Sequence, residues 1–219
     1  MIKAVVFDAW GTLFESKASS AAFYAINTLL GQTFSDFNYL RIFEAATCLD
    51  ASGKPENVAR RLTSSLGLSV SNEVLAQVSA LFETAFTSEV HLFDDAAEIL
   101  PELHSRYKLG LLSNSGVQSA DNLRRRFPLA SMFDAVLFSY EVGFLKPDKH
   151  FFEAILQRLE VLPSETVYVG DHPHVDVEGA TQAGIHAILI DRKLRNEGKC
   201  PRRCENLRGI LDFWPIIVD

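Results

Sequence analysis

One carboxylate in the sequence stands where it could do chemistry. Asp8 ends a short apolar run, Ala4-Val5-Val6-Phe7, and a Gly11-Thr12 turn follows it. A carboxylate in such a position can serve as a nucleophile that forms a covalent intermediate. Its neighbour two residues along is Trp10, whose indole offers only an N–H donor and no usable pKa. Asp8 therefore has a neighbour that cannot move protons.

Polar side chains follow the other apolar runs of the chain in the same way. They are Ser113, Asn114, Lys146, Asp171 and Asp176. If these runs are strands of a parallel sheet, their carboxyl ends share one edge, where ligands of such sheets bind. We therefore expect these residues to meet Asp8 in one crevice, although they lie far apart in sequence.

The elements that would position these residues form an alternating series. Apolar runs of strand length occur at 3–8, 109–112, 135–138, 167–170 and 187–190, without the alternation of a half-exposed strand, as in strands covered on both faces. Helical segments are expected at 94–106, 116–127, 148–160 and 176–183, with a kink or a later start of the first because of Pro101. The pattern predicts an α/β fold with a Rossmann-like, doubly wound parallel sheet.

Residues 15–90 interrupt this alternation. The stretch contains no convincing strand, and its apolar residues recur at helical spacing in segments such as VLAQVSALFETAF. Helices are expected at about 18–30, 36–50, 55–66 and 71–87. We predict a core domain of residues 1–14 and 91–219, and a helical cap domain of residues 15–90 over the carboxyl edge of the sheet.

Four short motifs, in order, resemble those of the haloacid dehalogenase superfamily, and the match covers the whole chain. They are D-x-x-G-T at residue 8, S-N at 113, K-P at 146 and G-D-x-x-x-x-D at 170. The resemblance implies that Asp8 is the nucleophile and that Thr12 supports its loop. It implies that Ser113 and Asn114, with nearby backbone amides, bind the substrate, and that Lys146 neutralises the nucleophile and the transferred group.

The resemblance also implies a Mg²⁺ site. Its ligands would be Asp8, the backbone carbonyl of Trp10, Asp171 and Asp176, with Asp176 in the inner or outer shell. Such hard oxygen ligands suit Mg²⁺. The N-terminal part of the cap carries Arg41, at about the place where L-2-haloacid dehalogenases have an arginine for the substrate carboxylate.

Trp10 departs from the phosphatases of the superfamily, which have a second aspartate there as general acid and base. Such catalysis contributes ~10²–10⁴-fold in rate. An aromatic residue resembles the L-2-haloacid dehalogenases, whose halide leaves without a proton. Those enzymes use no metal and lack the acids of the fourth motif, whereas this chain has Asp171 and Asp176. Two carboxylates beside Asp8 would raise its pKa without a cation, so the balance favours Mg²⁺-dependent phosphatase chemistry on a small phosphorylated metabolite.

Other interpretations stay open. The first is a metal-independent 2-haloacid dehalogenase. A second is a phosphonoacetaldehyde hydrolase using Lys54, and a third is a non-catalytic binding or scaffold protein. His172 and His174 lie beside Asp171 and titrate near neutrality, so either could replace the missing acid.

Composition limits the partners. The formal net charge of −7 over 219 residues argues against nonspecific binding to nucleic acid or anionic membranes. No apolar run approaches the ~20 residues of a membrane span, and the first residues are typical of a strand rather than a signal peptide. The three cysteines, two of them Cys200 and Cys204, fit free thiols in a reducing compartment. We expect a cytoplasmic monomer or homodimer acting on a small molecule.

Overall fold

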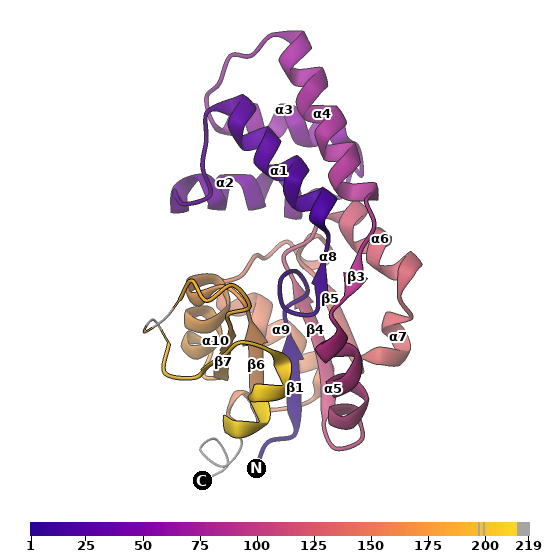
Figure 1. The fold of residues 1–219 in the computed structure, drawn as a ribbon, viewed down its shortest axis with the longest axis vertical. Coiled ribbons are helices and arrows are strands. Elements are labelled where there is room, and N and C mark those ends of the chain that lie inside the picture. The colour runs from indigo at the N-terminus through magenta and orange to yellow at the C-terminus, as the bar shows by residue number, and fades with distance from the viewer. Residues whose placement is uncertain (197, 199, 214–219) are drawn as a thin grey trace.

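The computed structural model describes residues 1–196, 198 and 200–213. In this part of the chain a parallel six-stranded sheet runs in the order β5-β4-β1-β6-β7-β8 (Figure 1). In that order the strands are Ala135–Phe138, Lys108–Ser113, Ala4–Phe7, Thr166–Gly170, His186–Ile190 and Arg203–Cys204. The prediction of an α/β fold with a doubly wound parallel sheet is confirmed.

The edge strand β8 was not predicted. It contains only Arg203 and Cys204, which pair with Leu189 and Ile190 of β7. Arg203 donates to the buried carboxylate of Asp191 at 2.8 Å, and Cys204 is a free thiol, as are Cys48 and Cys200. So short a strand is held by its neighbours rather than by an apolar pattern of its own, and the sequence rule for strands therefore misses it.

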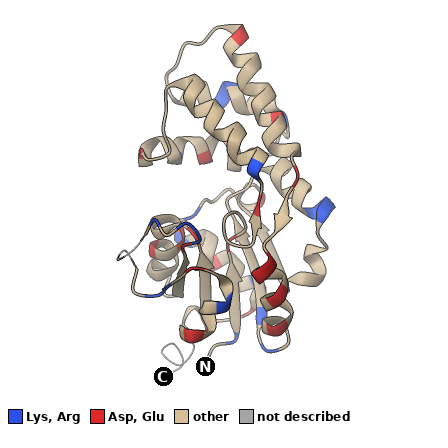
Figure 2. Ribbon diagram, viewed as in Figure 1, with Lys and Arg blue, Asp and Glu red and all other residues tan. Residues whose placement is uncertain are grey.

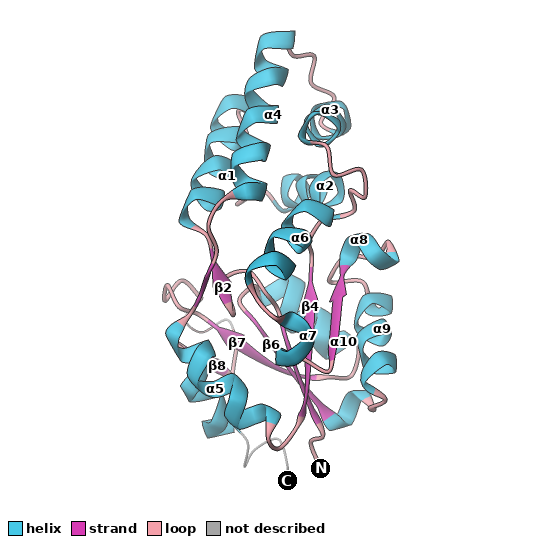
Figure 3. Cartoon of the chain, turned by 90° about the vertical axis from the view of Figure 1, so that its right-hand side faces the viewer, coloured by secondary structure: helices cyan, strands magenta, loops and turns pink. Residues whose placement is uncertain are grey.

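Helices cover both faces of the sheet because its strands send alternate side chains to opposite sides. Val5 and Phe7 of β1 face one apolar layer, whereas Ala4 and Val6 face the other. The helices α5 and α9 lie on opposite sides of the sheet (Figure 3). The main helices of the two layers are α5 (Asp94–His104) and α6 (Val117–Arg126) on the first face, and α9 (Lys149–Leu159) and α10 (Gly179–Gln182) on the second.

Two predicted helices differ from the structure. The helix α5 begins at Asp94 and runs through Pro101, so of the kink or later start expected from Pro101 the later start does not occur. Two acidic residues in its first turn favour the observed start. The predicted helix at 176–183 is a π-helix, Pro173–Glu178, followed by the short α10. The remaining short elements are α7 (Leu129–Met132), α8 (Ser139–Val142) and the 3₁₀ turns Pro163–Glu165 and Leu207–Phe213.

Four helices between β1 and β4 form a body with an apolar core of its own. The core includes Ile26, Phe43, Leu62 and Phe82, all buried. We call these helices the four-helix unit; they are α1 (Lys17–Leu30), α2 (Phe37–Cys48), α3 (Pro55–Ser65) and α4 (Asn72–Thr87). Figure 1 shows the unit beyond the carboxyl ends of the strands. Among the described residues no helix combines the length and apolarity that crossing a bilayer requires.

The chain enters and leaves the four-helix unit at one place. The strands β2 (Phe14–Glu15) and β3 (His91–Leu92) pair antiparallel there. Just beyond this pair, the hydroxyl oxygens of Ser16 and Ser88 lie 2.8 Å apart in a hydrogen bond. Ser16 also caps α1 by accepting a hydrogen bond from the amide of Ser19. The two connections are thus fixed to each other.

A second contact joins the four-helix unit to the sheet, through the turn after α2. The amide of Val117 donates to the carbonyl of Asp50 at 3.1 Å, and the Gln118 side chain donates to the carbonyl of Gly53 at 2.6 Å. The residue just before α6 must be small, because a Cβ at Gly116 would lie 2.2 Å from the carbonyl oxygen of Thr47. This approach holds α2 over the carboxyl edge of β4.

Candidate active site

The carboxyl ends of the strands bring the predicted residues together. Asp8 follows β1, Ser113 ends β4 and Asp171 follows β6. Carboxylate oxygens of Asp8, Asp171 and Asp176 lie within 4.8 Å of one another. Asp8, Lys146 and Asp176 are buried, with 6%, 3% and 2% of their surface exposed. Side chains far apart in sequence therefore form one charged cluster at this edge.

Lys146 is the positive centre of the cluster. Its ammonium donates to Asp8 Oδ1 at 2.6 Å, to Asp176 Oδ1 at 2.6 Å and to the Tyr168 hydroxyl at 2.8 Å. Burial alone would lower the pKa of Lys146, but the carboxylates of Asp176 and Asp8 outweigh it and raise the pKa well above its usual value. Lys146 therefore stays charged with all three of its donors engaged.

The negative charge of the three carboxylates exceeds the positive charge of Lys146. Burial raises the pKa of Asp8 to about 6, against the opposing effect of Lys146. The pKa of Asp171 is raised well above its usual range, mainly by burial and to a smaller extent by repulsion from Asp8 and Asp176. Carboxylates crowded in this way gain stability from a cation. The hard oxygen donors of this set fit Mg²⁺.

Asp176 does not cap a helix. It lies inside the π-helix, where its second oxygen accepts from the amide of His172 at 3.0 Å. His172 Nδ1 accepts from the amide of Val175, and burial lowers the pKa of His172, so this side chain is a neutral cap. His174 pairs with Glu178. Both histidines thus have structural partners away from Asp8.

Trp10 is tied to the serines that follow β4. Its indole N–H donates to Ser115 Oγ at 2.9 Å, and Ser115 Oγ lies 3.0 Å from Ser113 Oγ in a further hydrogen bond. The amide of Ser115 donates to Ser139 Oγ. Trp10 thereby orients the loop predicted to bind the substrate. The sequence did not single out Ser115, since a serine in a turn carries no distinctive pattern.

Two predicted residues bond to the scaffold, Asn114 through its side chain and Thr12 through its backbone carbonyl, whereas the buried Thr12 hydroxyl has no hydrogen-bond partner among the described residues. The Asn114 side chain accepts from the amide of Lys146 at 2.9 Å and donates to the carbonyl of Lys146 at 3.2 Å. Thr12 is buried, and its carbonyl accepts from Arg192 at 2.7 Å. Arg192 also pairs with Asp95 of α5, a helix along which acidic residues gather (Figure 2). Asn114 holds the backbone of Lys146, and Arg192 holds the loop that carries Asp8.

One face of α2 is turned toward this edge. Phe37, Arg41 and Glu44 are spaced i, i+4 and i+7, which places them on one side of the helix. The ring of Phe37 packs edge-on against His174, with 4.5 Å between centroids, and Glu44 Oε1 accepts from Asn114 Nδ2 at 3.3 Å. Arg41, between them, is exposed. Lys54, which is exposed, precedes α3. Sequence reasoning missed Glu44, because a single helical glutamate gives no signal.

Removing the Tyr168 hydroxyl should weaken the cluster. This buried hydroxyl accepts from Lys146 and donates to Asp176 Oδ1 at 2.9 Å. Because hydrogen bonds to charged groups contribute about 1.5–3 kcal/mol, Tyr168→Phe should lower the free energy of unfolding by about that amount in urea titrations. Tyr24→Phe, on an exposed tyrosine of α1, is the comparison. Equal small losses in both variants would contradict the assignment.

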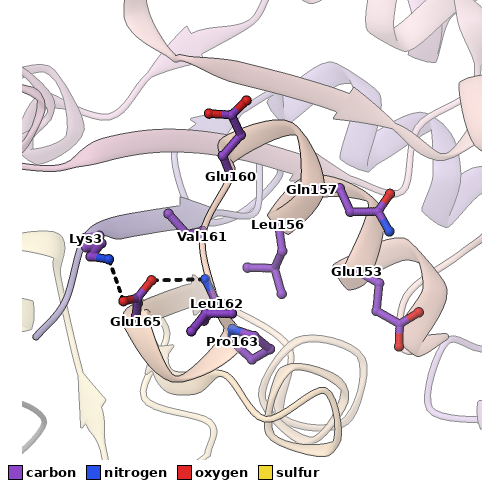
Figure 4. Close-up of a pocket in the computed structure, with 9 residues that line it drawn as sticks. All are labelled: Lys3, Glu153, Leu156, Gln157, Glu160, Val161, Leu162, Pro163 and Glu165. Atoms are coloured by element: carbon purple, nitrogen blue, oxygen red, sulfur yellow. Dashed lines mark hydrogen bonds and ion pairs between the residues drawn. The ribbon is translucent and has the colours of Figure 1, made fainter.

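A surface hollow lies well away from this cluster. Figure 4 shows it between the end of α9 and the turn before β6, with Lys3 and Glu165 paired at 2.6 Å on one side of it. Lys3 precedes β1 and Glu165 precedes β6, so the hollow is at the amino edge of the sheet. The charged cluster around Lys146 is at the opposite edge.

Comparison with known proteins supplies a family. The model of haloacid dehalogenase-like hydrolases matches residues 2–184. A phosphoserine phosphatase of Thermus thermophilus is 39% identical over 107 residues, 48% of this chain and 43% of that enzyme. The matched part of the chain thus spans less than half the length of that relative. A glyceraldehyde 3-phosphate phosphatase of Methanopyrus kandleri is 29% identical over 226 residues, 97% of each chain.

A solved structure resembles the chain over its full length. It is a 2-haloacid dehalogenase from Pseudomonas syringae, with a TM-score of 0.64 and 24% identity, covering 100% of this chain and 98% of that one. This likeness is one of fold. Enzymes named for phosphate esters and for carbon–halogen bonds therefore both stand among the proteins that this chain resembles.

Proposed function

The chain belongs to the haloacid dehalogenase-like hydrolases, and from that premise we propose that it is a Mg²⁺-dependent phosphatase of small phosphorylated metabolites. The observation that carries the proposal is the cluster of Asp8, Asp171 and Asp176 within 4.8 Å around one lysine. Metal-free chemistry gives no reason to gather three carboxylates, two of which have raised pKa values.

In this proposal Asp8 attacks the phosphorus atom and forms an aspartyl phosphate. Lys146, already held by Asp8 and Asp176, keeps the attacking carboxylate oriented and lowers the charge repulsion between it and the phosphoryl group. Ser113, oriented through Ser115 and Trp10, donates to a phosphoryl oxygen. Asp8, Asp171, Asp176 and the carbonyl of Trp10 would hold Mg²⁺, which when bound would neutralise phosphoryl charge.

We also propose that the four-helix unit, with its connections spanning residues 15–90, is a cap that determines the substrate. Its support is the separate apolar core of the unit and the face of α2 that bears Phe37, Arg41 and Glu44. Arg41 is exposed on that face, where a guanidinium could bind an anionic group of a substrate. Opening at the β2–β3 pair would admit the substrate.

The second candidate is a 2-haloacid dehalogenase. Trp10 favours it, because displacement of a halide from carbon by Asp8 requires no proton donor, and Arg41 could bind a carboxylate. Nothing in that reaction requires Asp171. The two candidates differ in their products and in their need for a metal.

One assay separates the candidates. Phosphate release from p-nitrophenyl phosphate should be measured with Mg²⁺ and with EDTA, beside chloride release from 2-chloropropionate under both conditions. We expect phosphate release with Mg²⁺, its loss in EDTA and its return when Mg²⁺ is added back. Chloride release that persists in EDTA, without phosphate release in Mg²⁺, would instead establish the dehalogenase.

A further inference from the structure

Hydrolysis of an alkyl phosphate needs a proton donor that Trp10 does not supply. The leaving alkoxide must be protonated, and the water that later cleaves the aspartyl phosphate must lose a proton. Trp10 cannot do either, and its N–H is engaged with Ser115. His172 and His174 have other partners. A further group is needed for esters with poor leaving groups.

Glu44 brings a carboxyl group to this edge from the other side. It projects from α2, is partly buried and accepts from Asn114 Nδ2 at 3.3 Å. The Asn114 side chain also forms hydrogen bonds with the backbone of Lys146. It therefore links Glu44 to Lys146, the residue that binds Asp8. No ion pair holds its carboxylate among the described residues. Glu44 also interacts electrostatically with Lys146, Asp176 and Asp8, so its carboxyl group lies at the same edge as the cluster.

The charges around Glu44 suit proton transfer. Burial raises the pKa of Glu44 to about 7, against the opposing effects of the Asn114 hydrogen bond and the Lys146 charge, with Asp176 and Asp8 raising it further. On its own helix the neighbouring charged or titratable groups are Arg41, exposed on the same face, and Cys48, a thiol whose pKa burial raises to about 12. An acid with a pKa near the working pH both gives and takes a proton readily.

We propose that Glu44, on the four-helix unit, is the general acid and base of this site. It would take the place of the aspartate that related phosphatases have at the position of Trp10. The proposal rests on the phosphatase function above. In the first step Asp8 bonds to phosphorus, the ester P–O bond breaks, and the departing oxygen takes the proton of Glu44 to leave as an alcohol. In the second step Glu44 takes a proton from water as the water oxygen bonds to phosphorus. The bond between phosphorus and the Asp8 oxygen breaks, and its electron pair returns to the Asp8 carboxylate.

Glu44→Gln tests this role because glutamine can still accept the hydrogen bond from Asn114 but cannot donate a proton as an acid. With Mg²⁺ present, we expect turnover of glycerol 3-phosphate, whose leaving group is poor, to fall by ~10²-fold or more. With p-nitrophenyl phosphate, whose leaving group needs no proton, the first burst of nitrophenol should keep its wild-type rate. The steady state should then slow, because the aspartyl phosphate lacks a base for its hydrolysis.

Two further variants sharpen the test. Glu83→Gln, on an exposed glutamate of α4, should leave both substrates unchanged. Adding Trp10→Asp to Glu44→Gln should restore glycerol 3-phosphate turnover, since it returns an acid to the site, whereas adding Trp10→Phe should not. Restoration by the aspartate alone would distinguish a lost proton donor from a distorted loop.

The outcomes are distinct. Wild-type turnover of glycerol 3-phosphate by Glu44→Gln would overturn the role of Glu44, as would equal losses in the nitrophenol burst and in alkyl ester turnover. A wild-type enzyme that releases phosphate from neither substrate would overturn the phosphatase function itself, and this role with it.

Discussion

Asp8→Asn is expected to lower turnover of p-nitrophenyl phosphate by at least ~10⁴-fold, the scale on which removal of a covalent nucleophile acts. The substituted asparagine could still accept the hydrogen bond that Lys146 now donates at 2.6 Å, so the side-chain packing should survive. The amide nitrogen and oxygen of asparagine are poor nucleophiles, however, and no aspartyl phosphate could form. Acid quenching with labelled substrate should therefore trap phosphoprotein in the wild type but not in the variant.

The control is Asp94→Asn, which removes an exposed carboxylate from the first turn of α5 and should leave turnover within about twofold of the wild type, as expected of a surface change. The midpoint of urea unfolding should show that Asp8→Asn is folded. A folded Asp8→Asn variant with appreciable turnover would show that the reaction does not pass through Asp8.

Lys146→Met should have the largest effect on stability. It would leave the carboxylates of Asp8 and Asp176 buried and facing each other without the ammonium that now lies 2.6 Å from each. Breaking a buried ion pair by removing one partner costs about 3–5 kcal/mol. We expect the free energy of unfolding at neutral pH to fall by that amount in urea titrations, and phosphatase turnover to be lost with it.

The matched control is Lys149→Met, since the exposed Lys149 pairs with Glu153 at 3.8 Å on the surface of α9. Exposed pairs of this kind contribute about 0–1 kcal/mol, so stability should hardly change. Addition of Mg²⁺ should recover part of the stability lost in Lys146→Met, because a second cation would offset the same carboxylates. A loss in Lys146→Met no larger than in Lys149→Met would contradict this account of the cluster.

Much of the fold could be predicted because its strands are apolar on both faces. The five predicted strands overlap β1, β4, β5, β6 and β7, and the four helices expected within residues 15–90 are α1 to α4. The sequence pattern that predicts strands and helices is lost where an element is short. The pair β2–β3 has two residues in each strand, and the π-helix around Asp176 depends on His172 accepting from Val175. Tertiary contacts, not local pattern, stabilise these elements.

The same limit applies to the candidate site. Asp8, Ser113, Lys146, Asp171 and Asp176 could be placed together, because strand ends converge and each follows a recognisable run. Tyr168 could not be identified, because within an apolar strand a tyrosine looks like any other core residue. Its hydroxyl nevertheless forms hydrogen bonds with both Lys146 and Asp176. Glu44 was hidden on a helix, and only the docking of α2 brings it to Asn114. A residue that reaches the site only because the four-helix unit docks on the sheet cannot be found from the spacing of residues in the sequence.

The hydrogen bond between Ser16 and Ser88 has a consequence for how such a chain could be altered. Everything between these serines begins and ends at one point of the sheet, so its removal would shorten one connection of the sheet, and the further bonds lost would be those of the turn after α2 to α6. Closing a chain between adjacent ends carries a small entropic cost. The segment could therefore be exchanged for another of different shape without rebuilding the strands. In our proposal such an exchange would also remove Glu44, so the new segment would have to supply its own proton donor along with its own specificity.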